Sequence, residues 1–192
     1  MLRAMGANFT LRIAGPADAA AIARVHVESW RAGYRGLLAD ELLVQLSVGE
    51  RELMWRERLT DANAPQHWRW MNVAVDRESM VGFISAGPSR EQDALAHSGE
   101  IYAIYVHPQR WSMGVGQALM SSAVAHLAEG GARDALLWVL ATNARARRFY
   151  ELGGWTWDGR AKTRRLTDLP DFDSEVEEVC YRRRLPYAPS PR

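Results

Sequence analysis

A buried strand that runs through a glycine-containing turn into a helix is the feature that most restricts the fold of this chain. Residues 100–107 are EIYAIYVH, which is apolar on both faces and typical of a central strand. Pro108 ends the strand, and Gly114-Val115-Gly116 opens a helix. The first amides of a helix lack partners and lie at the positive end of its dipole, which favours a phosphate site. The alternative is a tight turn without a ligand, because Gly-x-Gly alone is a weak signal.

Two common phosphate-binding motifs do not fit this turn. Gly116 is followed by Gln117 and Ala118, so the Gly-x-Gly-x-x-Gly fingerprint is missing. The Gly-x4-Gly-Lys-Ser/Thr loop of the P-loop enzymes is also missing. If the turn binds a phosphate, its fold is therefore a different one.

The rest of the chain alternates short apolar strands with helices. Strands are predicted where apolar residues alternate or run continuously, and helices where they recur at helical spacing. The central strands at 100–107 and 135–140 are each followed by a helix, which favours an α/β (or α+β) fold with a parallel pair at the centre. The predicted strands are 9–13, 68–75, 80–86, 100–107, 135–140, 155–167 and 176–185, and the predicted helices are 19–32, 38–59 (one or two), 114–128 and 143–152.

Length and composition are those of one globular domain. The chain has 192 residues, of which 47% are hydrophobic, and 24 basic and 23 acidic residues leave a net charge of +1. This balance argues against a nucleic-acid partner, and no apolar run is long enough for a membrane span. The single cysteine, Cys180, fits a reducing, cytoplasmic location, and no Cys/His cluster has metal-site spacing. We expect one domain over 1–185 and a Pro-rich tail at 186–192.

A second motif follows the later central strand. Asn143, Ala146, Phe149 and Tyr150 fall on one face of the predicted helix at 143–152. Asn143 is also a suitable N-cap residue, and Phe149 and Tyr150 are equally suited to a packed core. Spacing alone leaves a ligand-binding face and a structural face both open.

The two motifs together resemble the GNAT superfamily of N-acetyltransferases. The likeness is carried by the strand–turn–GVG–helix segment and by a strand followed by NARARRFYELGGW, and it spans about residues 101–158. It implies a mixed, mostly antiparallel central sheet of six to seven strands, with a splayed parallel pair and about four flanking helices. It also implies acetyl-CoA as cofactor, held where the two central strands separate.

The resemblance gives roles to individual residues around that cofactor. Backbone groups of the central strand would pair with the pantetheine arm and polarise the thioester carbonyl, and the amides of the turn would hold the pyrophosphate. Where the family usually has Arg or Gln and then Gly, this chain has Trp111 and Ser112, and we expect Trp111 to pack over the pocket. The implied cofactor-binding residues are Ile104, Tyr105, Val106, Trp111, Ser112, Met113, Gly114, Val115, Gly116, Gln117, Asn143 and Phe149.

Two residues are candidates for the chemistry. Tyr150 stands where the family has a tyrosine that protonates the departing thiolate. Glu100 resembles the glutamate that serves as base in the histone-acetylating branch, and in a regular strand it shares a face with Tyr102, Ile104 and Val106. The alternative for Glu100 is a solvated carboxylate at the end of a strand.

The acceptor side is less clearly marked. In the family, the first helix and the loop after it cover the acceptor cleft, so Trp30, Tyr34 and Arg35 are candidates for substrate contacts. Arg35 would suit a carboxylate on the acceptor, whereas core packing is the alternative for Trp30 and Tyr34. His26, on the same helix, either faces the cleft or is a structural histidine.

We therefore expect an N-acetyltransferase that moves an acetyl group from acetyl-CoA to a primary amine by direct attack in a ternary complex. The acceptor would be a small-molecule amine or a peptide, and a homodimer is compatible with the resemblance. Two alternatives stay open, a non-catalytic acyl-CoA sensor and an acetyltransferase for protein N-termini or side chains.

Overall fold

One mixed sheet forms the centre of the molecule. The computed structural model describes residues 9–60, 70–91, 97–166 and 175–186. Within them, seven strands pair in the order β1-β2-β3-β4-β5-β7-β6, and all neighbours are antiparallel except β4 and β5. The strands are β1 (Thr10–Ile13), β2 (Met71–Asp76), β3 (Ser79–Pro88), β4 (Ser98–Val106), β5 (Asp134–Leu140), β6 (Thr156–Arg165) and β7 (Glu175–Arg184).

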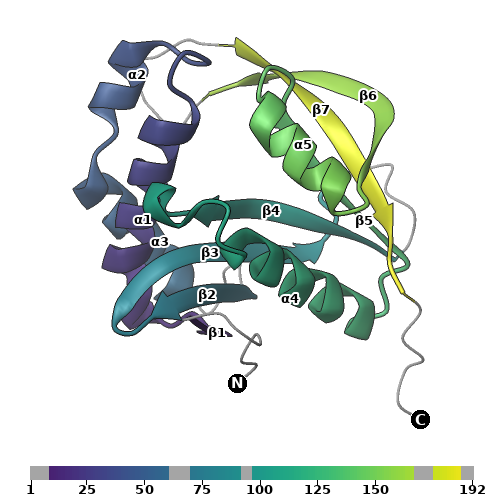
Figure 1. Cartoon of the computed structure of the whole chain (residues 1–192), viewed down its shortest axis with the longest axis horizontal. Helices are drawn as coiled ribbons and strands as arrows, with labels where there is room; N and C mark the ends of the chain where they lie inside the picture. The colour runs from purple at the N-terminus through teal and green to yellow at the C-terminus, as the bar shows by residue number, and fades with distance from the viewer. Residues whose placement is uncertain (1–8, 61–69, 92–96, 167–174, 187–192) are drawn as a thin grey trace.

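Helices cover both faces of this sheet (Figure 1). On one face, α4 and α5 pack on the strands through the largest apolar cluster, which includes Leu119, Leu137 and Tyr181. On the other face, α1 and α3 pack against β2 and β3 around Trp55 and Phe83. The helices are α1 (Ala19–Gly33), α2 (Asp40–Gln45), α3 (Val48–Thr60), α4 (Val115–Glu129) and α5 (Ala144–Leu152).

The fold confirms the expected mixed sheet with a parallel pair. The segment predicted as one or two helices at 38–59 forms two, α2 and α3, so the described chain has five α-helices where about four were expected. The strand predicted at 68–75 is observed over Met71–Asp76; Trp70 precedes this strand, and 68 and 69 lie outside the described residues. Most of the tail predicted at 186–192 also lies outside them, and the single-domain assignment stays a prediction.

A bulge in β4 changes which side chains share a face. The β3–β4 register shifts between Ser85 and Ala86, so that Tyr102 is the extra residue on β4. Ile104 and Val106 pack on the α4 side, whereas Ala103 and Tyr105 pack on the α1–α3 side. The expectation that Glu100 shares a face with Ile104 and Val106 is therefore wrong, because it assumed a regular pleat.

Candidate active site

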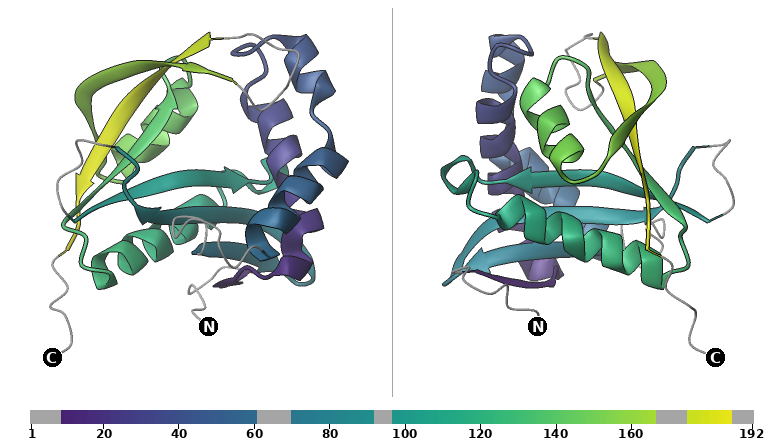
Figure 2. Two further views of the ribbon diagram at one scale, coloured as in Figure 1. Left: turned by 180° about the vertical axis from the view of Figure 1, so that it is seen from behind. Right: turned by 45° about the vertical axis from the view of Figure 1, so that its right-hand side comes forward.

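The two parallel strands separate part-way along their length. β4 and β5 pair only from Ser98–Ile101 to Asp134–Leu137, and beyond these residues each strand continues without the other. A cavity of about 620 Å³ occupies the opening and continues between α1, α3 and the β6–β7 hairpin. Figure 2 shows β4 and β5 side by side where they begin and diverging toward their other ends. The splayed pair therefore provides a passage from one face of the sheet to the other.

The open edge of β4 presents backbone groups to this cavity. The amide of His107 donates to the Val81 carbonyl at 2.9 Å, so alternate residues, including Tyr105, direct their backbone groups to β3. Ile104 and Val106 direct theirs to the opening. This arrangement suits the predicted backbone role of Ile104 and Val106 but contradicts it for Tyr105, which lines the cavity with its ring.

The turn before α4 offers a row of amides. Ala118 is the first residue whose amide donates within the helix, to Gly114 at 3.0 Å. In the part of the chain that the structure describes, no amide of residues 112–117 donates to a protein acceptor. Gly114 has φ of +82°, a left-handed conformation that points these amides outward. Ser112, Met113, Gly114 and Gln117 are exposed, so the amides are accessible to a ligand.

Trp111 packs over the opening, as expected. Its indole Nε1 donates to the Val106 carbonyl at 2.7 Å, and Ser29 Oγ donates to the same oxygen at 3.0 Å. The guanidinium of Arg145 lies over the Trp111 ring, 3.4 Å from its centroid. The Val106 carbonyl is therefore occupied by side chains, and a ligand paired to this residue would have to displace the indole or use the Val106 amide.

The α5 motif serves the structure as well as the cavity. Asn143 is the N-cap, because its Oδ1 accepts from the Ala146 amide at 3.0 Å, and it also lines the cavity. Phe149 packs at the edge of the main core, and a Cβ built on Gly116 would come within 3.4 Å of its ring. Val115 is buried beneath the turn. The structural alternatives for Asn143 and Phe149 are thus realised here.

Tyr150 reaches the cavity from α5. Its side chain is buried and lines the opening together with Tyr34 and Tyr105. Burial raises the pKa of the Tyr150 phenol, Tyr105 raises it further, and Arg145 opposes the change. The phenol is consequently neutral at physiological pH and retains a proton to donate.

Glu100 is buried but not free. Only 2% of its side chain is exposed, and it forms an ion pair with Arg90 at 2.5 Å. The Arg90 amide donates to the second carboxylate oxygen at 2.9 Å. Both oxygens are therefore acceptors already, and the alternative of a solvated carboxylate is wrong because the side chain lies beneath Arg90.

The acceptor candidates divide into two groups. Trp30 and Tyr34 line the cavity and pack edge-to-face, with ring centroids 4.9 Å apart. Arg35 is exposed just after α1 and is not among the lining residues, because the chain turns away there. His26 lines the cavity, and its Nδ1 accepts from the Trp55 indole at 3.2 Å.

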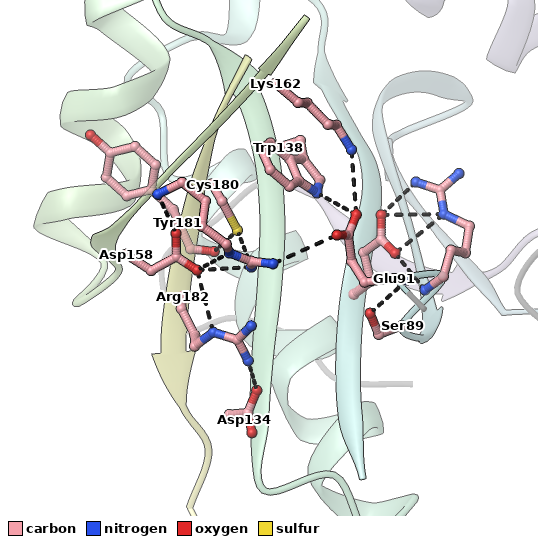
Figure 3. A network of polar contacts seen from close by, with 12 residues as sticks. Ser89, Glu91, Asp134, Trp138, Asp158, Lys162, Cys180, Tyr181 and Arg182 are labelled. Carbon is pink, nitrogen blue, oxygen red and sulfur yellow. Dashed lines mark hydrogen bonds and ion pairs between the residues drawn. The ribbon is translucent and has the colours of Figure 1, made fainter. Parts of the chain in front are cut away.

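A polar network at the far side of the cavity was missed by the sequence analysis. Glu91 accepts from the Trp138 indole at 3.0 Å and from Lys162 at 3.4 Å, and the Lys162 ammonium also lies over the Trp138 ring (Figure 3). On the β6–β7 hairpin, Arg164 and Glu178 form an ion pair at 3.2 Å. The only sequence signal for Glu91 was its place in the polar loop after β3.

Comparison with known proteins agrees with this geometry. The model of the acetyltransferase (GNAT) family matches residues 30–154. The chain belongs to the GNAT acetyltransferase family. This GNAT protein is 33% identical over 135 residues to the uncharacterized N-acetyltransferase YuaI of Bacillus subtilis, over 70% of this chain and 73% of YuaI.

Two solved structures share the fold of this GNAT protein. The PaiA N-acetyltransferase of Thermoplasma acidophilum, in complex with coenzyme A, has a TM-score of 0.68 at 16% identity and covers 92% of this chain and 98% of its own. The yncA protein of Salmonella typhimurium, with acetyl-CoA, has a TM-score of 0.64 at 19% identity and covers 96% and 98%. At this identity they show the fold alone.

Two features are absent from the described residues. None of the described helices combines the length and apolar character needed to cross a membrane. The described part of the chain also contains no group of three His, Cys, Asp or Glu side chains that could hold a metal ion.

Proposed function

We propose that this protein transfers an acetyl group from acetyl-CoA to a primary amine, without a covalent intermediate on the enzyme. The observation that carries the proposal is the buried Tyr150 phenol beside the opening between β4 and β5. The family match and the CoA complexes of two structural neighbours support the choice of acyl donor.

The residues present fit acetyl-CoA at both ends. The unpaired amides of residues 112–117 suit a pyrophosphate, because they point outward at the positive end of α4. The Ile104 amide and carbonyl, at the open edge of β4, suit an amide-containing arm that lies along the strand. Acetyl-CoA would supply a thioester whose carbonyl carbon is open to attack by an amine.

Tyr150 acts as the acid in this proposal. The amine nitrogen bonds to the thioester carbon, the carbon–sulfur bond breaks, and the phenol gives its proton to the departing sulfur. A phenol with a raised pKa is a weak acid for this step, since an ordinary thiol has a pKa of about 8.5. The same burial also raises the proton affinity of the sulfur, and the Arg145 charge helps the phenol to release its proton.

Glu100 is not assigned the role of the base that takes the proton of the amine. Both of its oxygens already accept hydrogen bonds from Arg90, so the carboxylate is held in an ion pair instead of being presented to an amine. An amine that enters in its neutral form needs only solvent as proton acceptor after the attack. The cavity of about 620 Å³ is of a size that suits a small acceptor.

Replacement of Tyr150 by phenylalanine tests the proposal. We expect kcat to fall by roughly 100-fold or more, with acetyl-CoA affinity within about threefold of the wild type. Transfer is measured as thiol release over a panel of amines, and affinity by calorimetry. Tyr181→Phe is the matched control, because that hydroxyl bonds Arg147 and Glu151 outside the cavity.

The outcomes separate the alternatives. Equal kcat in the Tyr150→Phe variant would remove the phenol from the acid role. Acetyl-CoA binding with no transfer to any amine or peptide would favour the sensor, and transfer only to peptides would favour the protein acetyltransferase.

A further inference from the structure

One wall of the cavity, formed by α1 and α3, combines positive charge with hydrogen-bond donors. Arg51 and Arg58 line it from α3, and His26 and Trp30 line it from α1. Among the described lining residues of these two helices, none is acidic. We call these four residues the α1–α3 wall.

Two donors of this wall have no acceptor. His26 Nδ1 accepts from Trp55, so the imidazole proton of the neutral ring is on Nε2. His26 Nε2 and Trp30 Nε1 are both buried without a hydrogen-bond partner in the described structure, and their side chains are at least nine-tenths buried. Buried polar groups in native proteins are normally satisfied, so two neighbouring orphan donors need an explanation.

Arg51 and Arg58 act electrostatically on the imidazole of His26. Burial, with smaller contributions from the two guanidinium groups, lowers the pKa of His26 to about 3. His26 therefore stays neutral and acts as a donor, not as a base. A wall of donors in a positive field is suited to an anion.

The opposite wall has a different character. Its carboxylates, Glu91, Glu100 and Glu178, are each matched by a cation, namely Lys162, Arg90 and Arg164. These pairs neutralise themselves within the protein. Among the described lining residues, the buried side-chain donors without a hydrogen-bond partner both lie on the α1–α3 wall.

We propose that the α1–α3 wall binds a carboxylate of the acceptor, so that the substrate is a small amino acid or another amine that carries a carboxylate. This inference rests on the proposed function. The carboxylate accepts from the Trp30 and His26 nitrogens in the field of the two arginines. Both nitrogens are covered by the contacting rings of Tyr34 and Tyr105, so this proposal requires those rings to turn when the carboxylate binds.

The α1–α3 wall and the proposed acid line the same cavity. The His26 ring stacks on Tyr105 at 4.8 Å, and Tyr105 is close enough to Tyr150 to raise the pKa of its phenol. Tyr105 therefore contacts the carboxylate site and also lies near the acid, which favours a compact acceptor. The contact with an acceptor carboxylate, which the sequence suggested for Arg35, is assigned in this proposal to the α1–α3 wall with the arginines of α3.

Competing acceptors test this assignment. Acetyl transfer is measured with the twenty L-amino acids, their amides and the corresponding amines without the carboxylate, in parallel with calorimetry of acetyl-CoA. We expect kcat/KM for the best amino acid to exceed that for its amide by at least about tenfold, since hydrogen bonds to a charged group are strong. The amide has the less basic amine and more of its neutral form, so chemical reactivity alone favours it.

Two arginine variants of α3 provide the structural test. Arg58→Gln should lower kcat/KM for the amino acid by about tenfold and leave the amide nearly unchanged. Arg56→Gln is the matched control, because Arg56 is exposed and pairs with Glu52 outside the cavity. Trp30→Phe removes the indole donor but keeps an aromatic ring, and it should reduce the preference in the same direction.

The outcomes are distinguishable. Amides or simple amines that match the amino acids overturn the inference, as does an unchanged preference in both Arg58→Gln and Trp30→Phe. Acetyl-CoA binding without transfer to any amino acid also overturns it and leaves the cofactor site intact. Failure to bind acetyl-CoA overturns the proposed function itself.

Discussion

A drop in pH from 7 to 5 should destabilise the protein through His26. The imidazole is 6% exposed and lies against the rings of Trp30, Trp55 and Tyr105. Burial, reinforced by Arg51 and Arg58, lowers its pKa to about 3 from the ordinary value of about 6.5. Between these two values the unfolded chain binds a proton that the folded protein refuses, so the free energy of unfolding decreases as the pH falls.

The size of this effect follows from the two pKa values. Full linkage to one proton changes the free energy of unfolding by about 1.4 kcal/mol per pH unit. Between pH 7 and pH 6.5 the histidine of the unfolded chain is only partly protonated, so this interval contributes little. The change in the free energy of unfolding from pH 7 to pH 5 is therefore about 2 kcal/mol. The loss continues until the folded protein itself takes up the proton near pH 3.

Urea unfolding of the wild type and of a His26→Gln variant isolates this effect. Glutamine does not titrate, and its amide oxygen can still accept from the Trp55 indole. Carboxylate titration affects both proteins alike, so the difference in free energy of unfolding between them should shrink by about 2 kcal/mol from pH 7 to pH 5. A difference that stays constant over this range would refute the argument that the imidazole is buried in its neutral form.

Two further substitutions test the cofactor end and the Glu100 site. Gly116→Glu should abolish CoA binding measured by calorimetry, because a side chain there meets Phe149 and brings a negative charge to the amides, whereas Ser121→Glu on the exposed side of α4 should not. Glu100→Gln should lower the free energy of unfolding by on the order of 2 kcal/mol, discounted because Arg90 is half-exposed, and leave the pH–rate profile unchanged. CoA affinity that is retained in Gly116→Glu would contradict the assignment of the pyrophosphate to the amides before α4. Loss of the acidic limb of the pH–rate profile in Glu100→Gln would identify Glu100 as the base.

Much of the fold was predictable because its signals are local. The apolar run at 100–107 and the amphipathic pattern at 143–152 lie within a residue or two of β4 and α5. Strand and helix formation depend on spacing within one segment, which a single sequence displays. The parallel pair followed from the order of the elements, since a strand–helix–strand unit returns in the same direction.

The bulge at Tyr102 shows where local patterns fail. The segment from Glu100 to Val106 is apolar on both faces, so its side-chain alternation carries no signal of an extra residue. The register break arises from pairing with β3, a strand that precedes it in the chain and whose alignment no spacing within β4 can reveal. The predicted face of Glu100 was wrong for this reason.

The partners of individual side chains could also not be predicted from the sequence. Glu100 was expected to face either an apolar surface or solvent, but the chain returns Arg90 across the loop to cover it. The available sequence signal for this pair was the opposite charge of Arg90 and Glu100, which lie near the two ends of the segment between the strands predicted at 80–86 and 100–107. Trp111 was anticipated over the pocket, whereas its bond to the Val106 carbonyl depends on the path of the turn.

The two ends of the cavity therefore differ in how they are encoded. The end that suits CoA consists mainly of backbone groups, whose placement depends on a turn with left-handed Ser112 and Gly114 and on two strands that separate. The glycine-containing turn leaves a recognisable motif in the sequence. The end that we propose for the acceptor consists of side chains from α1 and α3, which are adjacent only in the folded protein. Substitution at Arg58 or Trp30 changes the chemistry of that wall without disturbing the amides before α4. A fold of this kind can keep one acyl donor while the acceptor varies, so the acceptor must be inferred from the wall that contacts it.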